Sequence, residues 1–355
     1  MGLASAIALR SRGFSVTVAD PALPPIDKAC GEGLMPDALE SLARLGVTLG
    51  PEYVFPFRGI RFLGGGNAVD ASFPNGSGVG IRRTHLHQAL IDRAEEAGAT
   101  LLWGTAVRGL SERGVTLGHM KVDCRWVVGA DGENSRVRQW AGLESTRHKS
   151  LRFGFRRHYR IRPWADCVEI YWGSGSQIYV TPIGPEEICV AVISRDSHLR
   201  LDQALPFHAE LHARLKNAAV TTNERGAVSA TRRLARVYRD RVVLVGDASG
   251  SVDAITGEGL RLGFEQGMAL AEALAGNDLK AYGAAHRRLA RRPAFMAGLM
   301  LTLDHSDWLR RRVLSALSSE PRIFATQLAM HVGTATTGDF IRHSMMPLGR
   351  HLLAA

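Results

Sequence analysis

One stretch in the last third of the chain constrains the fold more than any other. Residues 242–245 are four consecutive apolar residues, Val-Val-Leu-Val, which predict a strand buried on both faces. Gly246 permits a sharp turn, and Asp247 then places a carboxylate at the carboxyl end of that strand. Gly257 and Gly259 precede an apolar helical pattern, and the free N–H groups of a helix start attract negative charge. The stretch predicts a site for a ligand with a polyol and an electron-rich ring, or else an ordinary strand–loop–helix unit.

Composition favours an enzyme of α/β type with two lobes. The chain has 355 residues, 45% of them hydrophobic, and 38 glycines, which fits a large folded core and argues against disorder. Its net charge of +10 would suit nucleic acid, an anionic membrane or an acidic substrate. No helix-turn-helix, zinc-finger or single-strand-binding signature accompanies this charge, so we expect no nucleic-acid partner.

The cysteines and histidines predict neither a metal site nor a disulfide framework. The four cysteines are far apart and form no CxxC pair, and the thirteen histidines show no HExxH spacing. We therefore expect no metal. No signal peptide is apparent and no apolar run is long enough to span a bilayer, so we expect a cytoplasmic protein.

The chain begins in the middle of a recognisable pattern. Residues 2–10 predict a helix, and residues 15–19 predict a strand that ends in Asp20. In a dinucleotide-binding βαβ unit the last glycine of G-x-G-x-x-G opens the helix, and an acidic residue about twenty positions later binds the ribose hydroxyls. Gly2 and Asp20 fit these two roles by spacing. The first strand and the first two glycines of that unit do not precede them, so we expect a mis-called or truncated start.

Residues 28–36 then predict a glycine-rich loop whose backbone can approach a cofactor closely. A helix is predicted to begin at Arg83. A second strand ends in Asp131-Gly132, again a carboxylate between a strand and a helix. Residues 151–193 predict consecutive strands of an antiparallel sheet, at 153–161, 168–172, 177–181 and 188–193. A helix is predicted over 201–215. After residue 282 the chain is helical and basic, with boundaries expected at Pro293, Pro321 and Pro347.

Taken together, these stretches resemble the FAD-dependent enzymes related to class A flavoprotein monooxygenases and geranylgeranyl-type reductases, over essentially residues 1–280. The resemblance implies an α/β fold: a Rossmann-like FAD-binding domain, an inserted antiparallel β-sheet substrate domain and a helical C-terminus. The FAD-binding domain would comprise residues 1–50, 80–150 and 235–280. The substrate-binding domain would comprise residues 51–79 and 151–234, and the helical segment residues 281–355.

The resemblance also implies which residues bind FAD. Gly2 would be the final glycine of the fingerprint, and Asp20 would bind the adenosine ribose. Arg83 would contact phosphate or ribityl oxygens, and Val107 would face the adenine through its backbone. The remaining cofactor positions are Asp131 and Gly132, then Gly246 and Asp247 at the ribityl chain, then Gly257, Gly259 and Leu260 beside the isoalloxazine.

The activity implied first is that of an NAD(P)H-dependent monooxygenase, which hydroxylates an aromatic or lipid-like molecule through a flavin hydroperoxide. NAD(P)H would visit transiently, because the chain has no second glycine-rich fingerprint. The alternative is an FAD-dependent reductase of prenyl-type double bonds, which the loop 28–36 and Thr256-Gly-Glu-Gly259 favour. Against it, Tyr179-Val-Thr-Pro182 lacks the Trp and Phe of the reductases' Tyr-x-Trp-x-Phe-Pro segment. A third possibility is a degenerate flavoprotein fold that binds a ligand without turnover.

No catalytic acid, base or nucleophile is predicted, because the cofactor performs the demanding step in this chemistry. Tyr159, Tyr171 and Tyr179 are candidates for the substrate pocket, although aromatic residues in such a sheet belong to the core more often. The apolar and basic C-terminal segment is expected to pack on the core as a helical lid. The alternative is peripheral contact with an anionic membrane.

Overall fold

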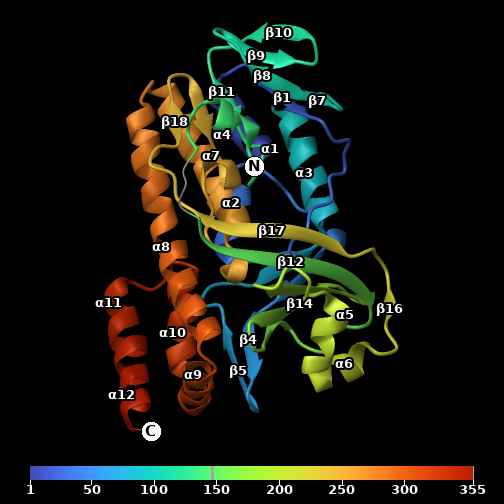
Figure 1. Ribbon diagram of the computed structural model, residues 1–355, viewed down its shortest axis with the longest axis vertical. Helices are drawn as coiled ribbons and strands as arrows, with labels where there is room; N and C mark the ends of the chain where they lie inside the picture. Colours follow the sequence, from blue (N-terminus) through green and yellow to red (C-terminus); the bar gives the residue numbers. More distant parts are fainter. Residues whose placement is uncertain (145–147, 355) are drawn as a thin grey trace.

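The computed structural model describes residues 1–144 and 148–354. One half of the molecule contains short parallel strands covered by helices (Figure 1). β1 (Thr17–Asp20) pairs in parallel with β7 (Thr100–Trp103). β11 (Val127–Gly129) pairs in parallel with β19 (Val242–Leu244), which β18 (Tyr238–Arg239) extends in the antiparallel direction.

Three helices pack beside these strands: α1 (Gly2–Arg10), α3 (Arg83–Glu96) and α7 (Gly259–Ala275). The helix α1 is buried from Leu3 to Leu9 because it lies between α3 and α7. Gly267 lets α7 approach α1 closely, since a Cβ at this position would lie 3.1 Å from Ser5 Oγ. The predicted helix at 2–10 and the strand ending in Asp20 are confirmed.

The other half is organised on an eight-stranded, mostly antiparallel sheet (Figure 1). Its order is β16-β12-β15-β14-β13-β4-β5, with β17 also paired to β12. The four strands expected between residues 151 and 193 are confirmed as β12 to β15. Their bounds, with those of the other strands, are β12 (His148–Arg160), β13 (Cys167–Trp172), β14 (Ser176–Gly184), β15 (Glu187–Ser194), β4 (Gly59–Gly64), β5 (Asn67–Ser72), β16 (Ala219–Val220) and β17 (Arg225–Arg232).

Smaller elements complete both halves. Two three-stranded sheets contain β8 (Val107–Leu110), β9 (Gly114–Leu117) and β10 (Met120–Asp123), and β2 (Gly33–Leu34), β3 (Val54–Phe57) and β6 (Gly78–Ile81). The short helices are α2 (Pro36–Arg44), α4 (Arg136–Trp140), α5 (Leu201–Ala204) and α6 (Ala209–Leu215). The helix expected over residues 201–215 is therefore divided, because Pro206 lies in a 3₁₀ turn between α5 and α6.

The C-terminal helices line one side of the molecule and connect its two halves (Figure 1). They are α8 (Leu279–His305), α9 (Asp307–Ser319), α10 (Pro321–His331), α11 (Thr337–Phe340) and, after a π-helical turn at Ile341–Met345, α12 (Met346–Ala354). Pro321 opens α10 as expected. The boundary expected at Pro293 is wrong: this proline is buried inside α8, which continues because it packs against α7 and α10. Pro347 is the second residue of α12, so an element boundary lies beside it as expected.

Candidate active site

A cavity of about 650 Å³ lies where the parallel strands, the large sheet and the C-terminal helices meet. The loops after β11 and β19 and the start of α7 form one wall. Side chains of β12 to β15 and β17 form a second wall, and α8, α9 and α10 form a third. Most of the lining is apolar, and it includes Phe57, Ile60, Phe62, Val168, Ile170, Met296, Leu299, Met300, Leu309 and Phe324.

The loop after β19 places a carboxylate on the first wall. β19 is buried throughout, as its apolar run predicts, and Gly246 takes a φ of 59°. The Gly246 N–H donates a hydrogen bond to Gln266 Oε1 over 2.8 Å, and Ser249 Oγ donates to the Gly246 carbonyl over 2.7 Å. This turn leaves Asp247 facing the cavity, where burial raises the pKa of its carboxyl group and nearby Glu133 adds to the effect.

The start of α7 adds backbone to the same wall. Gly257 has a φ of 70°, and Glu258 precedes the first helical residue, Gly259. A Cβ at either glycine would meet no atom within 4 Å, so both face open space. The free N–H groups of a helix start attract anions and electron-rich atoms, and this one opens into the cavity.

Arg83 brings a cation to the cavity from the start of α3. Its backbone N–H donates to Glu32 Oε1 over 2.9 Å, which fixes the beginning of the helix. Its side-chain Nη1 is buried, and no residue in the described ranges accepts a hydrogen bond from it. A buried guanidinium nitrogen without an acceptor is unfavourable, so the site is complementary to an anionic oxygen of a ligand.

A family of proteins described as "FAD binding domain" matches residues 1–284. The chain belongs to this FAD-binding family. Menaquinone reductase of Mycobacterium tuberculosis is 29% identical over 308 residues, which cover 78% of this chain and 75% of that protein. Digeranylgeranylglycerophospholipid reductase of Methanocaldococcus jannaschii is 26% identical over 257 residues, covering 66% of this chain and 65% of that protein.

Solved structures show the same fold. A flavoprotein/dehydrogenase from Cytophaga hutchinsonii superposes with a TM-score of 0.83 at 17% identity, over 99% of this chain and 96% of that one. A geranylgeranyl bacteriochlorophyll reductase-like protein from Thermoplasma acidophilum gives 0.72 at 20% identity, over 99% and 92%. The protein is therefore an FAD-binding oxidoreductase. The expected combination of a Rossmann-like domain, a substrate domain and a helical C-terminus is confirmed.

The residues at the cavity suit FAD. The unpaired nitrogen of Arg83 would bind a phosphate or ribityl oxygen, and the carboxylate of Asp247 would accept hydrogen bonds from ribityl hydroxyls. The open space beside Gly257 and Gly259 would admit the isoalloxazine, and Leu260 also lines the cavity there. Bound there, FAD would supply electron transfer to and from a substrate.

Of the other expected cofactor residues, one lines the cavity and four do not. Gly132 lines the cavity, whereas the Asp131 carboxylate accepts from Ser135 Oγ over 2.5 Å and so is used inside its own turn. Asp20 ends β1 and accepts a hydrogen bond from the Ala22 N–H over 2.9 Å, outside the cavity lining. Gly2, which opens α1, and Val107, which begins β8, also lie outside the cavity lining. The roles of all these residues in FAD binding stay predictions.

Met1 fills the space between the loop after β19 and α7. A Cβ on Gly263 would overlap Met1 Sδ, and one on Gly246 would come within 2.6 Å of Met1 Cγ. Only glycines permit this close approach of the Met1 side chain.

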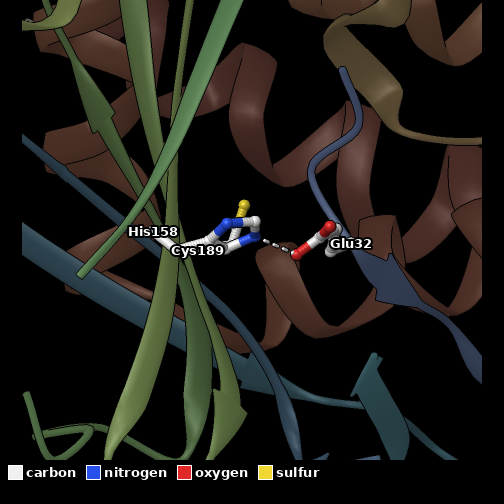
Figure 2. Close-up of side chains that lie close together, drawn as sticks. All are labelled: Glu32, His158 and Cys189. Atoms are coloured by element: carbon white, nitrogen blue, oxygen red, sulfur yellow. Dashed lines mark hydrogen bonds and ion pairs between the residues drawn. The ribbon is translucent and has the colours of Figure 1, made fainter. Parts of the chain in front are cut away.

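Beside the cavity, Glu32, His158 and Cys189 form a buried cluster (Figure 2). Atoms of these three residues that could bind a metal lie within 4.8 Å of one another. Glu32 Oε2 and His158 Nε2 are already hydrogen-bonded over 2.6 Å, and Arg156 Nη2 lies 3.6 Å from Glu32 Oε1. Both oxygens thus have protein partners, and the cluster joins the 28–36 loop to β12. The expectation of no metal site stays a prediction.

An ion network on the sheet side of the cavity was not predicted from the sequence. Arg152 is fully buried, and its guanidinium contacts Asp253 over 3.1 Å and Asp304 over 2.6 Å. Gln177 binds both Arg152 and Asp304. The network ties β12 and β14 to α8. The sequence has several arginines between residues 152 and 162, but the acidic partners of Arg152 are more than one hundred residues away in sequence, so the pairing could not be predicted.

A second group without a predicted role comes from the C-terminal helices, which the family match does not reach. His331 and Gln327 of α10 line the cavity, and His331 Nδ1 lies 3.6 Å from Glu258 Oε2. Among the candidate tyrosines, Tyr179 lines the cavity, whereas Tyr159 and Tyr171 lie in the core of the sheet. In the described part of the chain no helix is long and apolar enough to cross a membrane.

Proposed function

We propose that the protein is an FAD-dependent reductase that saturates a carbon–carbon double bond in a long apolar substrate. The observation that carries this proposal is the cavity itself. It extends from the glycines at the start of α7, past the large sheet, to α8, α9 and α10. FAD would fill the part beside Gly257 and Gly259. The remaining part, between the large sheet and α8, α9 and α10, is apolar and suits a hydrocarbon chain.

The walls support a prenyl-type chain. Three elements contribute apolar side chains at different depths: Met35 in the loop before α2, Ile170 on β13 and Met300 on α8. Flexible methionines adapt to irregular apolar shapes. The names of two relatives also support a lipid-like substrate, since menaquinone reductase and digeranylgeranylglycerophospholipid reductase are named as reductases of lipid-like molecules.

Hydroxylation of the same kind of substrate with molecular oxygen is the second candidate. It is favoured by the 26% identity, over 287 residues, to 2-heptyl-3-hydroxy-4(1H)-quinolone synthase of Pseudomonas aeruginosa, which covers 74% of this chain and 71% of that protein. The segment from Tyr179 to Pro182, without the reductases' Trp and Phe, also favours it. NAD(P)H is the proposed electron donor for either reaction.

One experiment separates the two reactions. The FAD-loaded protein is incubated with a polyprenyl substrate anaerobically with dithionite, and in air with NADH or NADPH. A product that gains two hydrogens without oxygen supports reduction. A product that gains one oxygen atom, formed only in air, would replace the proposal with the second candidate.

A variant checks that the cavity is where turnover occurs. Met300→Trp would fill part of the cavity, whereas Phe295→Trp changes an exposed position of the same helix outside the lining. We expect the first variant to lose turnover of long substrates and the second to keep it. Equal turnover by both variants would contradict the assignment of the cavity.

Peripheral membrane contact is a related proposal, because a lipid-like substrate would be delivered from a bilayer. Met345 lines the cavity and is 40% exposed, and it is followed by exposed Met346 and preceded by exposed Ile341. Co-sedimentation with anionic vesicles tests it: the double variant Ile341→Ser with Met346→Ser should bind less. Phe207→Ser, an exposed apolar position beside α5, should not. Equal binding by all three proteins would contradict membrane contact at this surface.

A further inference from the structure

Glu258 has one carboxylate oxygen that the protein leaves without a hydrogen bond. Its side chain is 1% exposed and lines the cavity at the start of α7. Arg261 Nη2 donates to Oε1 over 2.9 Å, and Arg292 Nη2 lies 3.8 Å from the same oxygen. Within residues 1–144 and 148–354, Oε2 accepts no hydrogen bond. A buried acceptor in this state is unfavourable unless a ligand completes it.

The carboxylate is held in a fixed position by its neighbours. Arg292 Nη2 donates a hydrogen bond to Asp37 Oδ2 over 2.7 Å, and Arg261 Nε lies 3.1 Å from the same oxygen in an ion pair. Two guanidinium groups from α7 and α8 are therefore shared by two carboxylates, those of Asp37 and Glu258. Because Oε1 is anchored by this group, Oε2 cannot rotate to a new partner without breaking the ion pairs.

His331 lies close to the free oxygen. Its Nδ1 lies 3.6 Å from Glu258 Oε2, which is longer than a hydrogen bond, and its side chain is 8% exposed. Gln327, four residues earlier on α10, also lines the cavity. The helix α10 thus presents polar groups to an otherwise apolar part of the cavity, close to a carboxylate oxygen without a donor.

We propose that Glu258 Oε2 and His331 bind a hydroxyl group of the substrate. The free atom is an acceptor, so its ligand must supply a donor, and a hydroxyl oxygen can also accept a hydrogen bond from His331. The substrate class is then a long apolar molecule that carries an alcohol or phenol hydroxyl at the end near α7. This inference rests on the proposed function only in assuming that a long apolar substrate occupies the cavity.

The test compares an alcohol with its methyl ether, which keeps the oxygen but replaces the hydroxyl hydrogen with a methyl group. Binding of 1-dodecanol and of its methyl ether to the oxidised, FAD-loaded protein is measured by calorimetry, without turnover. We expect the alcohol to bind at least about tenfold more tightly, because a hydrogen bond to a charged group is stronger than one between neutral groups. Equal affinities for alcohol and ether would overturn the proposal.

Variants show which side chains make the difference. In Glu258→Gln the amide oxygen stays with Arg261, so an NH₂ donor replaces Oε2, and the preference for the alcohol should disappear. His331→Phe should reduce the preference, and Gln327→Leu is the matched control that should keep it. A preference that survives Glu258→Gln, or that is lost only in Gln327→Leu, would overturn the assignment.

Two further readouts distinguish a lost hydroxyl site from a loss of folding or of cofactor. Thermal unfolding of each variant shows whether it folds, and only variants that melt with one cooperative transition are compared. FAD affinity is measured on the same samples, and Glu258→Gln should leave it unchanged. If that variant loses FAD, Oε2 faces the cofactor and the proposal fails. If products contain oxygen while the alcohol preference holds, the proposed reaction fails and the hydroxyl site stands.

Discussion

Two segments with the same sequence, Gly-Glu-Gly, line the cavity. In Gly31-Glu32-Gly33 the glutamate has a φ of 59°, and both of its oxygens have donors, the Arg83 N–H and His158. In Gly257-Glu258-Gly259 one oxygen is bonded to Arg261 and the other has no donor among the described residues. Both side chains are about equally buried, at 1% exposed.

This difference shows that the neighbours in space, and not the local sequence, decide what a buried carboxylate does. Glu32 is surrounded by donors from α3 and β12, so all of its hydrogen-bonding capacity stabilises the protein. Glu258 faces an apolar cavity on one side, so part of its capacity is available to a ligand. The first glutamate is expected to control stability and the second to control binding.

The largest effect is expected where the first carboxylate is removed. Glu32→Ala should lower the free energy of unfolding by about 3–5 kcal/mol, because it leaves His158 Nε2 and the Arg83 N–H without their buried partner. Urea unfolding measures this change. Glu40→Ala, at an exposed position of α2, should change it by less than about 0.5 kcal/mol. If Glu32→Ala lowers the free energy of unfolding as little as the control does, Glu32 does not stabilise the fold in this way.

A third carboxylate in the cavity extends the comparison to the cofactor. Asp247→Ala should weaken FAD binding by about 2–3 kcal/mol, roughly 100-fold, because the ribityl hydroxyls lose a charged acceptor. Titration of the apo-protein, followed by flavin fluorescence, measures the dissociation constant. Asp92→Ala, an exposed position of α3, is the control and should leave it unchanged. Retained FAD binding in Asp247→Ala would show that this residue does not bind the cofactor.

A matched pair of amide variants compares the two glutamates directly. Glu32→Gln must turn an NH₂ donor toward either the Arg83 N–H or His158, and should cost about 2–3 kcal/mol of unfolding free energy. Glu258→Gln keeps the bond to Arg261 and turns its NH₂ toward a position without a donor, so it should cost about 1 kcal/mol. Urea unfolding of both variants measures the difference. If Glu258→Gln is the more destabilising of the two, the comparison is wrong.

The local patterns made much of the fold predictable. The apolar run at 242–245 predicts a buried strand because each of its side chains must leave water, and the glycines after it allow only a tight turn. The antiparallel strands between 151 and 193 follow in the same way from alternation and turn residues. Pro293 was expected to end a helix but lies inside α8, whereas Pro206 divides a stretch that was expected to be one helix. Tertiary packing therefore decides whether a helix continues through a proline.

The site was less predictable, since it is assembled from residues far apart in the chain. Asp247 and Arg83 could be identified as polar groups beside a strand or helix end, and both line the cavity. His331 and Arg152 gave no such signal, because their partners Glu258, Asp253 and Asp304 are brought to them only by the folded arrangement of the large sheet and the C-terminal helices.

The smallest expected effect concerns Asp37, which shares its two arginines with Glu258. Burial raises the pKa of the Asp37 carboxyl group, and the attraction of Arg261 and Arg292 opposes this only in part. Between the unfolded pKa and the raised folded pKa, the native state binds more protons than the unfolded state, so stability contributed by Asp37 falls as the pH rises through that range. Asp37→Asn cannot titrate. The stability of the unsubstituted protein relative to this variant should therefore be greatest below the usual aspartate range, and should decrease toward neutral pH in urea unfolding series. A difference that grows with pH would mean that the arginines outweigh burial, and that the pair shared with Glu258 is held mainly by charge.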